Sequence, residues 1–330
     1  MHLRLPNKRL CRKTGRRSLA AMSTKLAGIV GGGLMGAGIA TKFALAGHEI
    51  LLLETSLARR ATIPAVIAGI LEELHAAGVI TSAGSEAARI RVKLVGDLAE
   101  LAPAPLVIEV IPEILTAKQE LYRKLESVLA PDALLASNTS GFMPDDLAAG
   151  LAYPGRFLLT HFWNPPHAIP LVEVVPGTRT APGLVEQAVA VLRGIGADPV
   201  VLCKAIPGFI GNRLQFAILR EALHLVRAGV AEPETIDAVM KASLGRRYGI
   251  AGPFESADLG GLETILQVGT HLMPELAKDE GVLEVLRAHT AKGEKGAASG
   301  AGFYQWTDER RAAMRQKRIT HQLKGRTAPG

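Results

Sequence analysis

The sequence predicts an α/β protein in which a doubly wound N-terminal domain is followed by an all-helical C-terminal domain. Three observations predict this class. From Lys25 to about residue 205, short apolar runs alternate with helix-length segments. The first apolar run ends in a glycine-rich turn, and after Lys204 only helical patterns follow. Short apolar runs separated by helices are typical of an open parallel sheet with helices on both faces.

The individual elements follow from the length of each apolar run and from the turn residues that bound it. Strands are expected at residues 26–30, 50–53, 92–95, 106–110, 133–136, 157–160, 171–175 and 199–202. Helices between them are expected at residues 34–46, 57–77, 117–129 and 182–194. Beyond the break at Pro207-Gly208, helices are expected at residues 209–228, 234–243, 262–276 and 281–289.

The charge distribution argues against nucleic-acid binding. The chain has 38 Lys and Arg against 31 Asp and Glu, a formal net charge of +7. Seven of the basic residues and no acidic residue lie in residues 1–22, and the segment after Trp306 is basic as well. The body between these ends is slightly acidic, whereas a nucleic-acid-binding domain carries a basic face. We therefore expect a small-molecule substrate and no nucleic-acid partner.

The first 22 residues leave three interpretations open: a targeting peptide, a stretch translated upstream of a working start at Met22, or a flexible arm. We favour the last two, because no secretory apolar region and no amphipathic pattern is present. The charge-free run 26–41 has 16 residues and six glycines, too short and too glycine-rich to span a bilayer. We expect a cytoplasmic protein without a membrane span.

The cysteine and histidine content predicts no metal site. Cys11 and Cys203 are too few for a disulfide scaffold or a cysteine-based zinc site. His48, His75 and His167 have no partner at the spacing of metal ligands.

A dinucleotide site is predicted where the first strand runs into Gly31-Gly32-Gly33-Leu34-Met35-Gly36, a G-x-G-x-x-G pattern that opens a helix. The first glycine permits a tight turn, the second lets the backbone approach a pyrophosphate, and the third allows close packing of helix on strand. Glu54 ends the second strand, 18 residues after Gly36, where a carboxylate holds ribose hydroxyls. It favours NAD over NADP, a preference that Arg59 and Arg60 weaken slightly. The predicted cofactor-binding residues in this region of the Rossmann-type domain are Gly31, Gly33, Leu34, Met35, Gly36 and Glu54.

A candidate catalytic pair lies further along the chain. His161 ends a predicted strand, and Glu173 lies in the next one. The carboxyl edge of an open α/β sheet is where ligands bind. A histidine with a carboxylate partner suits acid–base chemistry, because imidazole titrates near neutrality. The residues alone also allow a structural histidine bonded to a buried glutamate.

Together, these segments resemble the L-3-hydroxyacyl-CoA dehydrogenase family. The resemblance covers about residues 26–305 and rests on the glycine-rich turn, on the motifs Ser137-Asn138-Thr139-Ser140, His161-Phe162-x-Asn164-Pro165 and Pro207-Gly208-Phe209-Ile210-Gly211-Asn212-Arg213, and on Glu173. It extends into Gly252-Pro253-Phe254-Glu255 and residues 300–304. The resemblance implies a reversible, NAD-dependent oxidation of a secondary alcohol.

The same resemblance implies roles for individual residues. His161 would be the catalytic base and Glu173 its partner, with Ser140 and Asn212 around the substrate oxygen. The family's positions near the nicotinamide half of the cofactor correspond to Glu113, Lys118, Ser140 and Asn164.

The chain departs from the acyl-CoA pattern, which leaves the substrate open. Family members that use CoA usually carry lysines in a helical hairpin after the second strand, but this chain has no Lys or Arg between Arg60 and Arg89. The phosphate groups of CoA would be bound best by cationic side chains in that hairpin. From the resemblance we expect an L-3-hydroxyacyl-CoA such as 3-hydroxybutyryl-CoA, as in fatty acid metabolism. The alternative is a small CoA-free 3-hydroxy acid or alcohol, as in the gulonate and carnitine dehydrogenases. Arg246 and Arg247 could bind a free carboxylate or simply be a solvated pair at a helix end.

The predicted organisation has four segments: a basic extension at 1–24, an NAD-binding domain with a helical hairpin at 25–205, a helical substrate and dimerisation domain at 206–306, and a basic tail at 307–330. By analogy with the family we expect a homodimer. A non-catalytic dinucleotide-binding protein, like the lens crystallins related to this family, is the alternative of another class. This alternative is disfavoured, because the chain has all four residues that the resemblance assigns to catalysis: Ser140, His161, Glu173 and Asn212.

Overall fold

The structure, a computed structural model, describes residues 25–323. The predicted extension at 1–24 and the last residues of the predicted tail lie outside this range. The chain divides into two units: residues 25–209 with 316–323 form the first, and residues 210–315 form the second. Each unit is described by itself below.

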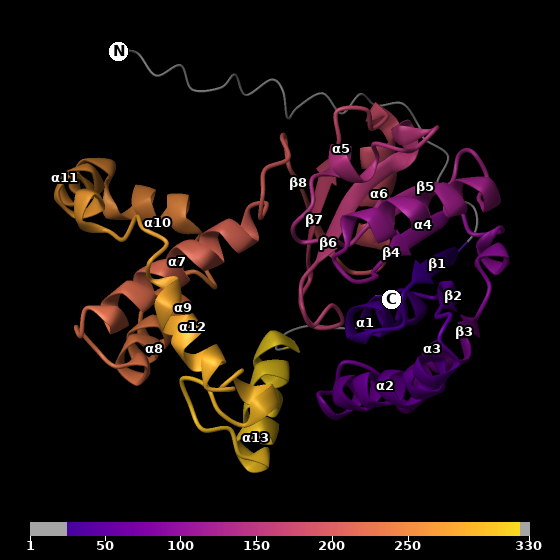
Figure 1. The fold of residues 1–330 in the computed structure, drawn as a ribbon. Coiled ribbons are helices and arrows are strands. Elements are labelled where there is room, and N and C mark those ends of the chain that lie inside the picture. The colour runs from indigo at the N-terminus through magenta and orange to yellow at the C-terminus, as the bar shows by residue number, and fades with distance from the viewer. Residues whose placement is uncertain (1–24, 324–330) are drawn as a thin grey trace. The chain divides into compact units, whose positions relative to one another are not determined.

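The first unit is built on an eight-stranded sheet of order β3-β2-β1-β4-β5-β6-β7-β8 (Figure 1). The strands are β1 (Leu26–Val30), β2 (Glu49–Leu53), β3 (Val92–Val95), β4 (Leu106–Glu109), β5 (Leu134–Ser137), β6 (Phe157–Phe162), β7 (Leu171–Pro176) and β8 (Asp198–Val201). All eight were predicted from their short apolar runs. In central strands such as β4 and β5 the run is nearly continuous, because both faces are buried. The doubly wound fold class is confirmed.

Two strands, β7 and β8, run opposite to the other six and so differ from the expected parallel sheet. β7 runs antiparallel to β6, whereas every other neighbouring pair in the sheet is parallel. The connection between them, residues 163–170, is too short to contain the crossover that a parallel pair needs. The chain therefore turns straight back beside β6, and this reversal builds the site described below.

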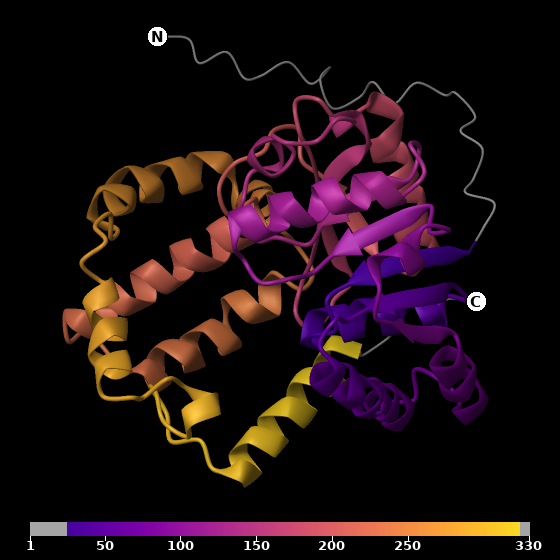
Figure 2. The ribbon, with the colours of Figure 1, turned by 45° about the vertical axis from the view of Figure 1, so that its right-hand side comes forward.

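Helices cover both faces of the sheet (Figure 2). They are α1 (Leu34–Leu45), α2 (Leu57–Ala76), α3 (Ser82–Ile90), α4 (Leu115–Val128), α5 (Pro144–Leu147) and α6 (Pro182–Gly194). α3 and the one-turn α5 were not predicted. The start of α3 is rich in serine and glycine, which suggests a loop, but the Thr81 side chain accepts the N–H of Gly84 and caps the helix.

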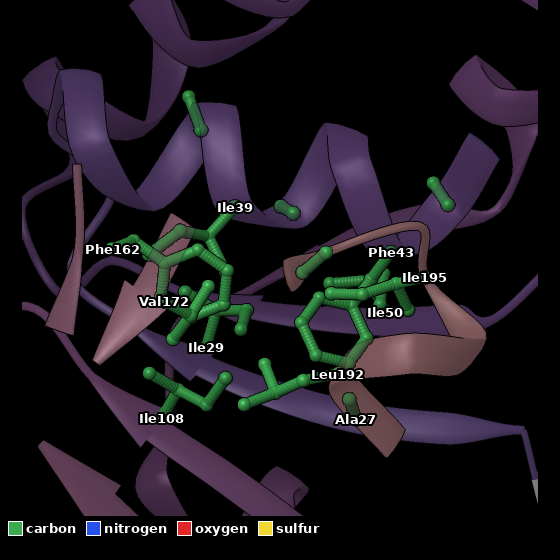
Figure 3. Packing of buried hydrophobic residues seen from close by; sticks show 14 of the residues in the cluster. Ala27, Ile29, Ile39, Phe43, Ile50, Ile108, Phe162, Val172, Leu192 and Ile195 are labelled. Atoms are coloured by element: carbon green, nitrogen blue, oxygen red, sulfur yellow. The ribbon is translucent and has the colours of Figure 1, made fainter. Parts of the chain in front are cut away.

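Two apolar layers follow from the period of two along each strand. One layer packs α1 and α6 on the sheet; Figure 3 shows Ile29 and Ile108 from the sheet together with Phe43 of α1. The other layer packs Leu125 of α4 and Leu147 of α5 on the opposite face. Burying both faces fixes which side chains of each strand point to which layer.

The second unit consists of helices, drawn in orange in Figure 1: α7 (Gly211–Arg227), α8 (Pro233–Ala242), α9 (Leu244–Arg247), α10 (Pro253–Gly260), α11 (Leu262–Leu272) and α12 (Leu283–Ala291). A further helix, α13 (Asp308–Leu323), was not predicted, because its sequence is strongly charged and was interpreted only as a basic tail. Its last part belongs to the first unit, where Ile319 and Leu323, four residues apart, enter the α1/α6 layer.

None of the helices between residues 25 and 323 is long and apolar enough to cross a membrane.

Candidate active site

The glycine-rich turn after β1 has the geometry that the sequence predicted. Gly31 has a φ of 109°, a conformation that favours glycine, and a Cβ there would lie 2.9 Å from the carbonyl oxygen of Val110. A Cβ on Gly36 would collide with the carbonyl oxygen of Gly31. The turn and the helix that follows it are therefore packed too closely for side chains at these two positions.

The N-terminus of α1 is suited to a phosphate group. Gly33 is its N-cap residue, and a Cβ there would meet no atom within 4 Å, so the space in front of the helix is open. No side chain caps α1 and its first turn carries no acidic residue. Leu34 and Met35 form the start of that turn, where backbone N–H groups and the helix dipole attract anions.

Glu54 lies beside this turn, as predicted for a ribose-binding carboxylate. Its side chain is buried and accepts the backbone N–H of Gly32 at 3.3 Å and that of Ser56 at 3.0 Å. These bonds hold a negative charge next to the turn. The residues around the end of β1 thus fit a dinucleotide.

His161 and Glu173 stand directly opposite each other in the β6–β7 ladder. His161 Nδ1 lies 2.8 Å from Glu173 Oε2, and the two residues are 6% and 1% exposed. Directly opposed side chains on antiparallel strands come within contact distance. The reversal of β7 therefore creates this pair. Because Nδ1 of His161 faces the glutamate, the other ring nitrogen, Nε2, does not take part in this contact.

Two aromatic rings flank the imidazole. The centroid of the Trp163 ring is 5.9 Å from that of His161, and the centroid of the Phe209 ring is 5.4 Å away. Trp163 Nε1 also donates a hydrogen bond to Glu173 Oε2 at 3.3 Å. Sequence reasoning assigned no role to Trp163, because its hydrogen-bond partner depends on how β6 and β7 pair.

The segment after β5 is tied to both β6 and the residues after β4. Asn138 Oδ1 accepts the N–H of Phe162 at 2.8 Å. Glu113 accepts the Thr139 hydroxyl at 2.8 Å and the Ser140 N–H at 3.0 Å. Ser140 itself is exposed. The structure thus brings Glu113 and Ser140 together, two of the residues that the resemblance assigns to the nicotinamide half of the cofactor.

A buried polar network centred on Glu109 was missed by the sequence analysis. Glu109 Oε1 accepts Lys118 Nζ at 2.6 Å, and Oε2 accepts the hydroxyls of Tyr122 at 2.5 Å and Ser137 at 2.7 Å. Burial and the nearby Glu109 charge raise the pKa of Tyr122. Lys118 also lies 3.6 Å from Glu113, so the network reaches the segment that holds Ser140. One feature of the sequence could have indicated this network, namely a glutamate at the end of an otherwise apolar strand.

Two predicted site residues remain, Asn164 and Asn212. Asn164 is exposed in the connection after β6. Asn212 is the second residue of α7 and belongs to the second unit, so its role remains a prediction. Within residues 25–323, no group of three or more His, Cys, Asp and Glu side chains could hold a metal ion.

A doubly wound sheet with this turn and this open helix end defines a dinucleotide-binding domain. Comparison with known families agrees with the geometry. Residues 26–206 match the family described as "3-hydroxyacyl-CoA dehydrogenase, NAD binding domain", and residues 208–306 match its C-terminal domain. The chain belongs to the 3-hydroxyacyl-CoA dehydrogenase family, whose members act on CH–OH groups with NAD. The resemblance inferred from the motifs is confirmed.

Individual relatives include two kinds of dehydrogenase. The chain is 34% identical to the 5-formyl-3-hydroxy-2-methylpyridine 4-carboxylate 5-dehydrogenase of Mesorhizobium japonicum over 88% of this chain and 93% of the relative. It is also 34% identical to a probable 3-hydroxybutyryl-CoA dehydrogenase of Deinococcus radiodurans over 84% and 99% of the two chains. A solved structure described as the pyridine-carboxylate enzyme, "an NAD+ dependent dismutase", matches with a TM-score of 0.84 and 32% identity, covering 92% of this chain and 99% of the other.

Proposed function

We propose that this protein oxidises the hydroxyl group of a small, CoA-free 3-hydroxy acid or alcohol, reversibly and with NAD, and that His161 and Glu173 are its acid–base pair. The observation that carries the reaction type is the buried contact of 2.8 Å between His161 Nδ1 and Glu173 Oε2. A histidine and a glutamate held this way in a dry environment form a proton-transfer unit rather than a solvated ion pair.

The chain's own residues account for the movement of the proton. Glu173 accepts the N–H at Nδ1 and fixes the tautomer in which Nε2 carries the free lone pair. His161 Nε2 takes the hydroxyl proton of the substrate, and the Glu173 charge stabilises the resulting imidazolium. In the reverse direction Nε2 returns that proton to the alkoxide. When bound, NAD supplies the hydride acceptor. Ser140 and Asn212 are proposed to hold the substrate oxygen where negative charge develops.

The cofactor would be held at two places. The open N-terminus of α1 at Gly33 would bind the pyrophosphate, and Glu54 the adenosine ribose. Glu113, Lys118 and Asn164 are proposed for the nicotinamide half. Of these, Lys118 is already fixed by Glu109 before any ligand is bound.

The preference for a CoA-free substrate rests on charge. Residues 61–88, which cover α2 after its first turn and most of α3, contain three glutamates and no Lys or Arg. Such a hairpin repels the phosphates of CoA. Arg246 and Arg247, exposed on α9, are proposed as partners for a substrate carboxylate. The similarity to the pyridine-carboxylate dehydrogenase supports this substrate class.

A second candidate is the oxidation of an L-3-hydroxyacyl-CoA in fatty acid metabolism. It is favoured by the probable 3-hydroxybutyryl-CoA dehydrogenase relative, and by a solved (S)-3-hydroxybutyryl-CoA dehydrogenase from Ralstonia eutropha that matches with a TM-score of 0.71 and 30% identity over 87% of this chain and all of the other.

The two candidate substrate classes can be distinguished with two compounds that differ only in the CoA thioester. NAD reduction is measured with (S)-3-hydroxybutyrate and (S)-3-hydroxybutyryl-CoA, and with a panel of small hydroxy acids and hydroxymethyl compounds. We expect turnover only with CoA-free compounds. Turnover confined to the thioester would overturn the CoA-free assignment but keep the reaction type, whereas NAD binding without turnover of any alcohol would support the non-catalytic alternative.

We also propose that the protein is a homodimer formed through its helical unit. Large apolar side chains on α7, α10 and α11 are exposed, among them Phe216 at 59%, Phe254 at 87% and Leu259 at 83%. Contiguous exposed apolar surface marks an interaction site. Light scattering should give twice the chain mass of 34.9 kDa, and Phe254→Glu should shift the mass toward the monomer. A monomer at micromolar concentration would contradict this proposal.

A further inference from the structure

We infer that Trp163 is a positioning residue that sets the pH range in which His161 works as a base, by donating its indole N–H to Glu173. The inference rests on the proposed function, because it concerns the proton-transfer unit assigned above.

The geometric basis is a shared acceptor. Glu173 Oε2 lies 2.8 Å from His161 Nδ1 and 3.3 Å from Trp163 Nε1. Trp163 follows β6 directly, two residues after His161, so the same strand end delivers both donors to one carboxylate oxygen. An indole nitrogen is a donor only, so the direction of this bond is fixed.

The effect of the second donor follows from burial. Glu173 is 1% exposed, so water does not screen the interaction of its charge with its hydrogen-bond partners. A hydrogen bond from Trp163 withdraws negative charge from Oε2 and weakens the attraction of that oxygen for an imidazolium. Removing the indole N–H is therefore expected to strengthen the attraction between Glu173 and an imidazolium at position 161.

β6 and β7 carry no ionisable side chain besides His161 and Glu173, and in the β7–β8 ladder Glu173 is paired with Val200. Asp198 begins β8, in register with Leu171. On the other neighbouring elements, Asp145 of α5 accepts the N–H of Thr178, Lys118 of α4 bonds Glu109, and Glu113 bonds Thr139. These three groups are engaged in bonds outside the pair.

The first test uses the unaltered protein and needs no substrate. The chain has two tryptophans, so a ¹⁵N spectrum shows two indole N–H signals. The Trp163 signal should move with pH at the same midpoint as the ring signals of His161. The Trp306 signal should not, because that ring lies against Arg310 and Tyr304. An indole signal of Trp163 that ignores the protonation of His161 would overturn the inference.

The second test compares Trp163→Phe with the matched control Trp306→Phe. Loss of the N–H with retention of an aromatic ring should raise the pH midpoint of the His161 ring signals by about 0.5 to 1 unit, since hydrogen bonds to charged groups contribute on that scale. The acid limb of the kcat/KM profile for alcohol oxidation should move by the same amount. The kcat/KM of Trp163→Phe should therefore be about 3- to 10-fold lower than that of the unaltered protein below the midpoint, and equal to it above the midpoint.

The outcomes separate this inference from the proposed function. An unchanged or lowered midpoint in folded Trp163→Phe, or an equal shift in Trp306→Phe, would show that the ring only packs. If no alcohol is oxidised but the His161 midpoint rises in Trp163→Phe, the proposed function fails while the role of Trp163 toward the pair stands. If Trp163→Phe does not fold, the indole titration of the unaltered protein decides.

Discussion

Replacing His161 with glutamine is expected to lower kcat by roughly 100- to 10,000-fold, the usual contribution of a general acid–base group, while NAD binding remains. Glutamine keeps a polar side chain opposite Glu173 but cannot take up a proton. Because the glycine-rich turn and Glu54 contact other elements, the cofactor site should not change. Steady-state NAD reduction and calorimetric titration with NAD measure the two properties independently.

The matched control for this prediction is His48→Gln. His48 is also partly buried and packs its ring on Phe43, but it precedes β2 and so lies at the amino edge of the sheet. Burial and the nearby charge of Lys25 lower the pKa of His48. Among residues 25–323 its Nδ1 has no hydrogen-bond partner, whereas Nδ1 of His161 contacts a carboxylate. We expect His48→Gln to keep full turnover. If His161→Gln loses NAD binding and turnover together, His161 is a structural residue and the proposed mechanism is wrong.

The strands and most helices of the first unit could be predicted because burial on both faces leaves a simple record in the sequence. A strand such as β4 is apolar along nearly its whole length, and glycine or proline punctuates its ends. The cofactor site could be predicted for a related reason. Its requirements at Gly31 and Gly36 are steric and local, so they appear as residue types at fixed spacing.

Pairing between strands could not be predicted in the same way. Glu173 lies 12 positions after His161, and the residue types in this segment do not indicate that the second strand turns back beside the first. The only indication is the length of the connection, which is too short for a crossover. The contact of Trp163 with Glu173 is hidden for the same reason. The Glu109 network is non-local as well, because its members come from β4, α4 and β5.

Helix α13 illustrates a different limit. Its mean composition is polar, and the two residues that bury it, Ile319 and Leu323, are too few to produce a clear apolar face in the sequence. Much of its sequence consists of strong helix formers such as Ala, Arg, Lys, Met and Gln, and the two apolar side chains pack it on the core of the first unit. Local propensity and tertiary packing therefore act together in this element.

Lys118→Met is expected to destabilise the first unit by about 3–5 kcal/mol, the range for removing one partner of a buried ion pair. Lys118 is 1% exposed and Glu109 is fully buried, so the remaining carboxylate would keep a charge with no cation beside it. Methionine matches the length of the lysine stem, so little of the loss comes from packing. The change is measured as a shift of the urea midpoint at constant slope.

The control is Lys124→Met on the same helix. Lys124 lies 2.7 Å from Glu120, about as close as Lys118 is to Glu109, but both partners are well exposed. Water already solvates that pair, so its loss should leave the urea midpoint almost unchanged. Equal midpoints for the two variants would mean that the buried pair contributes nothing. A large loss confined to Lys118→Met should be accompanied by weaker substrate turnover even where the variant is folded, because Lys118 also lies 3.6 Å from Glu113, and Glu113 accepts the N–H of Ser140. Stability of the core and the placement of the proposed substrate-binding serine then depend on the same buried lysine.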